Sequence, residues 1–199
     1  MRATRTARDC GADVVRPRST GRSCDRPVVT ARGTDAWGFF AVQSVTATKR
    51  RWRPRLDLRV DVASGGVRDS SAFQSFHELY ASSAYLGEAQ FLGLGNLVMV
   101  TPGVSVMPTP ETSVALEYGL ARRLDASEAV RAGGGRAYDA TLRTDAHEIG
   151  GLLRLSGSRT VSPYLTLFFT HEQLVAGAAL HRAALPSGRY SHLGATLRY

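Results

Sequence analysis

"RLDLRVDVA", residues 55–63, is the stretch that decides the fold class. Its aliphatic side chains alternate strictly with charged ones, Leu56, Leu58, Val60 and Val62 with Arg55, Asp57, Arg59 and Asp61. A period of two places successive side chains on opposite faces of a β-strand. The stretch therefore predicts a strand that has one hydrocarbon face and one charged face.

The same alternation recurs along the chain between turn residues. We expect seven strands, at about residues 36–48, 55–63, 96–107, 112–123, 147–157, 160–171 and 189–199. We also expect a turn at "SGSRT", residues 156–160, and a polar, mobile loop at "RAGGGRAYD", residues 131–139. Most of these strands exceed the usual length of about 5–6 residues and suit the roughly 9–11 residues that cross a bilayer.

Alternation alone leaves two architectures open, an antiparallel transmembrane β-barrel and a soluble β-sandwich or lipocalin-like binding module. Three details favour the barrel. The strands are long, their polar face carries Arg, Asp, Glu and small residues, and Tyr199 ends the chain in register with an outward face. A charged face of this kind suits a wet lumen, because a charge that faces lipid costs about 2–4 kcal/mol near the midplane. Trp37 and Trp52 then suit either interfacial aromatic girdles or ordinary packing.

The composition divides the chain at about residue 35. The net charge is +8, and residues 1–35 hold eight Arg against four acidic residues without any period of 2 or 3.6. We predict an unstructured Arg-rich segment or an artefact over 1–35 and the folded part over 36–199. Residues 36–199 show no Lys/Arg stripe interleaved with aromatics, so we expect no nucleic acid partner despite a pI near 10.2.

The sequence lacks the motifs of several other classes of protein. No run of about 18 apolar residues predicts a spanning helix, and the N-terminal segment lacks the apolar core of a secretory signal. The His-Glu pairs have no second His at zinc-protease spacing, and no nucleophile stands with a base. Cys10 and Cys24 lack the partners of a zinc site. We therefore predict no enzyme, no cofactor and no metal.

A set of motifs in fixed order carries a family resemblance. The set is Ser64-Gly65, Phe73, Phe76, Tyr80, Tyr85-Leu86-Gly87 and Asn96-Leu97. Together with "HEIGGLLRLSGSRTVSPYLTLFF" from residue 147 and the closing "HLGATLRY", this resembles the C-terminal part of the alginate export family of bacterial outer-membrane β-barrels. The resemblance covers about residues 36–199. It implies an incomplete C-terminal portion, about seven strands, of a larger barrel in the bacterial outer membrane.

The resemblance also implies a function. It points to a porin-like conduit that passes an anionic polysaccharide or a small anionic solute through an Arg-lined lumen, because guanidinium groups pair well with carboxylates. The expected partners are outer-membrane lipid and the anionic solute, with periplasmic export partners left open. A second reading is that these charges only pair with neighbouring strands. The candidate pore-lining residues are Arg55, Asp57, Arg59, Asp61, Glu117, Arg123, Glu148, Arg154 and Arg198.

Overall fold

The computed structural model describes residues 36–66, 75–76 and 85–199, and most of them form one antiparallel sheet. Its seven strands follow one another in the order β1-β2-β3-β4-β7-β8-β9. The predicted all-β antiparallel class is confirmed. The strands are β1 (Gly38–Thr46), β2 (Arg55–Ala63), β3 (Leu97–Thr109), β4 (Thr112–Arg122), β7 (Glu148–Ser162), β8 (Leu165–Ala176) and β9 (Gly188–Leu197).

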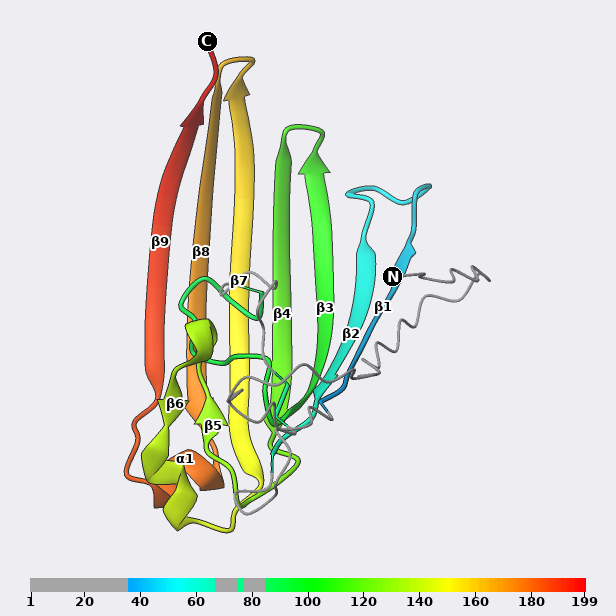
Figure 1. Cartoon of the computed structure of the whole chain (residues 1–199). Coiled ribbons are helices and arrows are strands. Elements are labelled where there is room, and N and C mark those ends of the chain that lie inside the picture. Colours follow the sequence, from blue (N-terminus) through cyan, green and yellow to red (C-terminus); the bar gives the residue numbers. More distant parts are fainter. Residues whose placement is uncertain (1–35, 67–74, 77–84) are drawn as a thin grey trace, which may run out of the picture.

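The two ends of the sheet differ in their connections (Figure 1). Short turns join β1 to β2, β3 to β4 and β7 to β8 at one end, which we call the turn end. Longer connections leave the other end, the loop end. They contain the short strands β5 (Val130–Arg131) and β6 (Ala137–Tyr138), two 3-10 helices at Gly133–Gly135 and Asp139–Arg143, and the helix α1 (Ala178–Arg182).

The strand pairing gives the sheet the two faces that alternation predicts. On β2 and β3, Leu58 pairs with Pro102 and Arg59 pairs with Thr101, so apolar and polar positions stay in register. We call the face that carries Arg59 the inner face and the other the outer face. The outer face exposes many large apolar side chains, among them Leu56, Val104, Leu116, Leu120, Phe169 and Leu193. An apolar surface of this extent needs lipid or a partner to cover it.

The sheet is open in the part of the chain that the structure describes. β1 and β9 lie at opposite edges, and neither pairs with the other. The described residues hold no second large sheet packed across the first, as a sandwich would require, since β5 and β6 form only a two-stranded ribbon. The architecture is that of a partial barrel wall.

The prediction of a turn at residues 156–160 is wrong. β7 continues to Ser162, and the turn falls at Pro163 and Tyr164. Gly157 pairs with Phe169 inside the sheet, so its glycine marks the close approach of an aromatic ring rather than a turn. The predicted polar loop at residues 131–139 contains the paired strands β5 and β6, and Ala132 is buried there.

A bulge at the start of β7 changes which side chains face inward. Ala121 pairs with Gly150, but the next residue, Arg122, pairs with Glu148, so Ile149 is the extra residue. Gly150 has a φ of 141°, and a Cβ there would lie 2.0 Å from the Val175 carbonyl oxygen. Only glycine fits this position. The bulge buries Ile149 in the core rather than placing it on the outer face.

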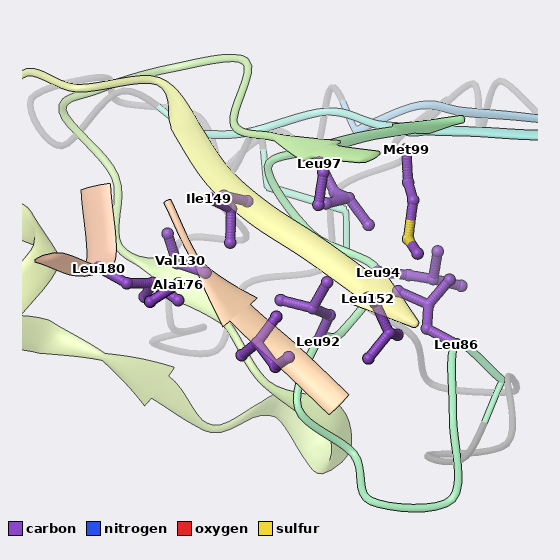
Figure 2. Close-up of a cluster of buried hydrophobic side chains, with 12 residues drawn as sticks. Leu86, Leu92, Leu94, Leu97, Met99, Val130, Ile149, Leu152, Ala176 and Leu180 are labelled. Carbon is purple, nitrogen blue, oxygen red and sulfur yellow. The ribbon is translucent and has the colours of Figure 1, made fainter. Parts of the chain in front are cut away.

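The hydrophobic core lies on the inner face at the loop end (Figure 2). There the sheet contributes Met99, Leu152 and Leu174, and the loops and α1 pack against them. Leu152 is an apolar residue on the inner face of β7, where Arg154 and Ser156 are polar, and its burial in this core explains its apolar side chain. The other members are Leu86, Leu92, Leu94, Leu97, Ala121, Val130, Ile149, Ala176 and Leu180.

Candidate functional site

A row of charged side chains crosses the inner face. Register places Asp57 beside Gly103, Gly103 beside Glu117, Glu117 beside Arg154 and Arg154 beside Glu172. Four charged residues of four different strands therefore lie at one level of the sheet. We call Asp57, Glu117, Arg154 and Glu172 the charged row.

Arg154 is the central cation of the charged row. Its Nη1 atom lies 3.2 Å from Glu117 Oε2, and its Nε atom lies 3.5 Å from Glu172 Oε1. Its Nη2 atom donates a hydrogen bond of 2.6 Å to the Leu86 carbonyl. The Arg154 side chain keeps 20 % of its surface exposed, whereas that of Glu172 keeps 1 %. One cation thus joins an accessible carboxylate to a buried one.

Glu172 fixes the segment 85–95, which we call the inner segment, against the sheet. Its carboxylate accepts hydrogen bonds from the backbone N–H groups of Glu88 (2.8 Å) and Ala89 (2.9 Å). A Cβ on Gly87 would lie 2.7 Å from Glu172 Oε2, so the absence of a side chain lets the carboxylate approach. Hydrogen bonds to a charged acceptor are worth about 1.5–3 kcal/mol each.

A second charged group holds the first residue of the inner segment. Arg59 Nε lies 3.0 Å from Asp61 Oδ2, and the Tyr85 hydroxyl donates a hydrogen bond of 3.0 Å to Asp61 Oδ1. The Arg59 guanidinium also lies 5.4 Å from the centroid of the Tyr85 ring. Burial, with the neighbouring Asp61 carboxylate as a second cause, raises the pKa of Tyr85 to about 12.

Arg59 and Arg154 each have guanidinium nitrogens that donate no hydrogen bond to any described residue. Within the described part of the chain, Arg59 Nε and Nη2 and Arg154 Nε are buried and have no hydrogen-bond partner. Their ion pairs bring the atoms close, at 3.0–3.5 Å, but not into hydrogen-bond geometry. A buried donor without a hydrogen bond costs about 1–3 kcal/mol, and the nearby carboxylates of Asp61 and Glu172 offset part of this cost.

Arg123 lies in a different place from the charged row. It follows the end of β4 and is 2 % exposed, and burial lowers its pKa. Its guanidinium donates to four backbone carbonyls of the connection between β4 and β7, those of Ala146 (2.7 Å), Glu128 (3.2 Å), Thr141 (3.0 Å) and Thr144. Arg123 thereby holds that connection in its folded shape.

The remaining candidates lie toward the ends of the sheet. Arg55 is exposed at the turn end and forms an ion pair of 2.7 Å with Asp57. Glu148 is exposed at the loop end, where the bulge pairs it with Arg122. Arg198 follows β9 and is exposed. The structure thus pairs Arg55 with Asp57, Arg59 with Asp61 and Arg154 with Glu117, but it leaves Arg123, Glu148 and Arg198 apart from these pairs.

Sequence reasoning missed Glu172 and Tyr85. Glu172 follows the inward Thr170 by two residues, so the same alternation could have placed it, but the predicted strand ends at residue 171. Tyr85 was named only as a motif residue of the family resemblance, because it reaches Asp61 from a connection that has no period.

The motif residues of the resemblance hold the loops to the sheet. Asn96 is fully buried; its Nδ2 donates to the Asp125 carbonyl and its Oδ1 accepts from the Asp125 N–H, both at 2.7 Å. The Ser64 carbonyl accepts from the N–H groups of Phe76 and Asn96. Phe73 and Tyr80 lie outside the described residues. These motifs therefore mark a supporting frame around the candidate site.

Helices that could span a membrane and clusters of metal ligands are two further features to consider in the described residues. None of the helices there has the length and apolar character needed to cross a membrane. In the same residues, no group of three or more His, Cys, Asp or Glu side chains could hold a metal ion.

The fold and the charged row define a class of protein. It is an antiparallel β protein whose long strands carry apolar side chains on one face and paired charges on the other. The family model for alginate export matches residues 20–192. The chain belongs to the alginate export family, a family of outer-membrane transport proteins and not of enzymes, and the resemblance of its motifs is confirmed. The match begins at residue 20, inside the Arg-rich segment. A comparison with curated proteins finds no match.

Proposed function

We propose that the inner face lines a conduit in the outer membrane that passes an anionic polysaccharide or a small anionic solute. Arg59 and Arg154 are the residues that contact the solute. The observation that carries the proposal is that both arginines lie on the inner face and keep part of their side chains exposed, 17 % for Arg59 and 20 % for Arg154. The outer face, with its exposed aliphatic side chains, contacts outer-membrane lipid.

The inner face offers a path to Arg154 from the turn end. Between the turns and the charged row it carries Arg55, Phe168 and several small side chains with hydroxyl groups, and the small side chains leave room for a solute and bond to it weakly. Ser113 and Ser158, for example, share a hydrogen bond of 2.9 Å across β4 and β7. Glu117 and Arg154 keep 32 % and 20 % of their side chains exposed, so a solute that passes Arg55 from the turn end can reach them.

The ion pairs at the charged row suit transient binding. A carboxylate of the solute competes with Glu117 for Arg154, and Glu117 takes the guanidinium back when the solute moves on. Conduction needs sites that bind strongly enough to admit an ion and weakly enough to release it. Asp57, Asp61 and Glu117 are in this proposal the fixed carboxylates that keep the arginines from trapping the solute.

Ion selectivity in planar bilayers tests the proposal. The full chain would be compared with Arg59→Gln, Arg154→Gln and the control Arg143→Gln, whose side chain is exposed in the loops. We expect a conductance that favours anions, and a lower anion-to-cation permeability ratio in both inner-face variants but not in the control. Unchanged selectivity in both inner-face variants would overturn the assignment of these arginines, and a chain without conductance would overturn the conduit itself.

A further inference from the structure

The turn between β1 and β2, residues 47–54, is strongly basic. It carries Lys49, Arg50, Arg51 and Arg53, and none of the four forms an ion pair with any described residue. All four side chains are exposed. We call residues 47–54 the basic turn.

The basic turn has a defined shape. The Ala47 N–H donates to the Pro54 carbonyl at 2.9 Å, and the Met107 N–H of β3 donates to the Trp52 carbonyl at 2.7 Å. Trp52 and Arg53 adopt positive φ angles of 70° and 43°, a region that costs a residue with a side chain about 1–2 kcal/mol. Strained backbone of this kind persists where the surroundings hold it, and it often accompanies a binding role.

The basic turn also presents an aromatic surface. Trp52 is 51 % exposed, and the Arg51 guanidinium lies 5.9 Å from the centroid of its ring. An exposed tryptophan beside several guanidinium groups combines a flat apolar face with donors for carboxylates. Sugar rings that carry carboxylates offer both complementary features, a face of C–H groups and an anion.

The excess positive charge of the described residues lies at the turn end. Nine basic and nine acidic residues occupy the rest of the described chain. The turn end itself carries two acidic residues, Asp57 and Glu111, and seven basic ones, Lys49, Arg50, Arg51, Arg53, Arg55, Arg159 and Arg198. A localised field of one sign raises the local concentration of an oppositely charged solute and its rate of association.

We propose that the basic turn is a capture site for an acidic, carboxylate-bearing polysaccharide, with Arg50, Arg51 and Arg53 pairing its carboxylates and Trp52 stacking on a sugar ring. This inference rests on the proposed function. Short turns of outer-membrane barrels face the periplasm, which is the side from which an exported polymer arrives. The polymer meets the basic turn before it meets Arg154.

A membrane surface is the other anionic partner that such a turn could meet. The turn between β3 and β4 contains Pro110 and Glu111, and that between β7 and β8 contains Pro163 and Tyr164, so neither carries a basic residue. A general attraction to lipid headgroups would favour basic residues on every turn. Four of the seven basic residues at the turn end lie on this one turn, and this concentration favours a single local ligand.

Tryptophan fluorescence tests this site directly, because the chain contains only two tryptophans, Trp37 and Trp52. Trp37→Phe, in the full chain in detergent, leaves Trp52 as the sole reporter. We expect an oligouronate of defined length to change the Trp52 fluorescence saturably, and added salt to weaken the binding. A neutral oligosaccharide of equal length should leave the signal unchanged.

Charge variants give the matched comparison. In the Trp37→Phe background, Arg50→Gln/Arg51→Gln/Arg53→Gln should weaken oligouronate binding about tenfold, since each exposed pair contributes modestly. Arg136→Gln/Arg143→Gln/Arg182→Gln, which removes the same charge from exposed residues at the loop end, should bind as the parent does. Equal weakening by both triple variants would overturn the proposal.

Two further results would separate this inference from the proposed function. If vesicles of phosphatidylglycerol change the Trp52 signal but the oligouronate does not, the turn binds lipid and the capture site is wrong. If the chain conducts anions in bilayers but the oligouronate leaves the Trp52 signal unchanged, the conduit stands and the capture site alone fails.

Discussion

The two halves of the inner face carry the same alternating sequence pattern but have different surroundings. Toward the loop end, the inner segment and the connection between β4 and β7 cover Met99, Leu152 and Leu174 with a packed core. Toward the turn end, nothing in the described structure covers Ser113 and Ser158, which stay partly exposed. The charged row lies between these halves. Alternation therefore fixes which way a side chain points, and the loops determine whether it meets water.

The largest expected change in stability comes from a substitution of Arg123, in the half of the inner face that the loops cover. Arg123→Met leaves four backbone carbonyls without their donor, and we expect the free energy of unfolding to fall by about 3–5 kcal/mol. Denaturant unfolding in detergent measures the change. Arg159→Met, at an exposed position near the turn end, is the control and should change stability by less than about 0.5 kcal/mol. Equal losses for the two variants would contradict the contrast between the halves.

The next largest effect is expected at the boundary between the halves. Glu172→Gln removes the charge that binds Arg154 and weakens the acceptor of the Glu88 and Ala89 N–H groups, at a cost of about 2–3 kcal/mol. Hydrogen–deuterium exchange should show faster exchange at these two amides. Glu111→Gln, in an exposed turn, should leave them protected. Unchanged protection in Glu172→Gln would mean that the inner segment is held by its leucines alone.

A smaller effect is expected from a steric change where the inner segment approaches Glu172. Gly87→Ala introduces a methyl group 2.7 Å from Glu172 Oε2, and we expect a loss of about 1–2 kcal/mol as the segment moves outward. Gly103→Ala, at the level of the charged row, has the flexible Glu117 side chain as its nearest neighbour, at 3.1 Å, and should cost less. Denaturant midpoints of the two variants test the order. A reversed order would show that Gly87 has room for a side chain.

The smallest expected effect depends on pH. Tyr85→Phe removes one hydrogen bond to Asp61, worth about 0.5–1.5 kcal/mol. Because the pKa of Tyr85 is raised from its ordinary value of 10.0 to about 12, this contribution is fully present below pH 10.0 and is lost as the pH rises through about 12. Unfolding of both proteins across this range should show a difference that shrinks with rising pH. A constant difference would contradict the assignment, and Tyr164→Phe controls for the loss of an exposed hydroxyl.

The local alternation of apolar and polar residues was sufficient to predict the strands and their two faces. Residues 55–63 and 112–122 form strands as predicted, because a period of two survives wherever the backbone is regular. It failed at the bulge, where Gly150 shifts the register and places Ile149 in the core and Glu148 at an exposed edge. It also failed at residues 156–160, because glycine and serine mark turns and close ring contacts alike.

The rest of the candidate site depends on contacts between distant parts of the chain. Glu172 meets the inner segment across more than eighty residues, and Tyr85 meets Asp61 from a connection without any period. No local pattern encodes such pairs. The motif residues of the family, such as Asn96 and Gly87, did mark this region, but they mark the support around the charges and not the charges themselves.

Cysteine accessibility tests most directly whether the inner face meets water and the outer face meets lipid. Cys10 and Cys24 are the only cysteines, so a Cys10→Ser/Cys24→Ser background allows single probes on adjacent residues of β7. In native membranes, Ser156→Cys on the inner face should react with a charged, water-soluble thiol reagent, and the reaction should lower the conductance. Leu155→Cys on the outer face should not react. Reaction at Leu155→Cys together with protection at Ser156→Cys would contradict the account.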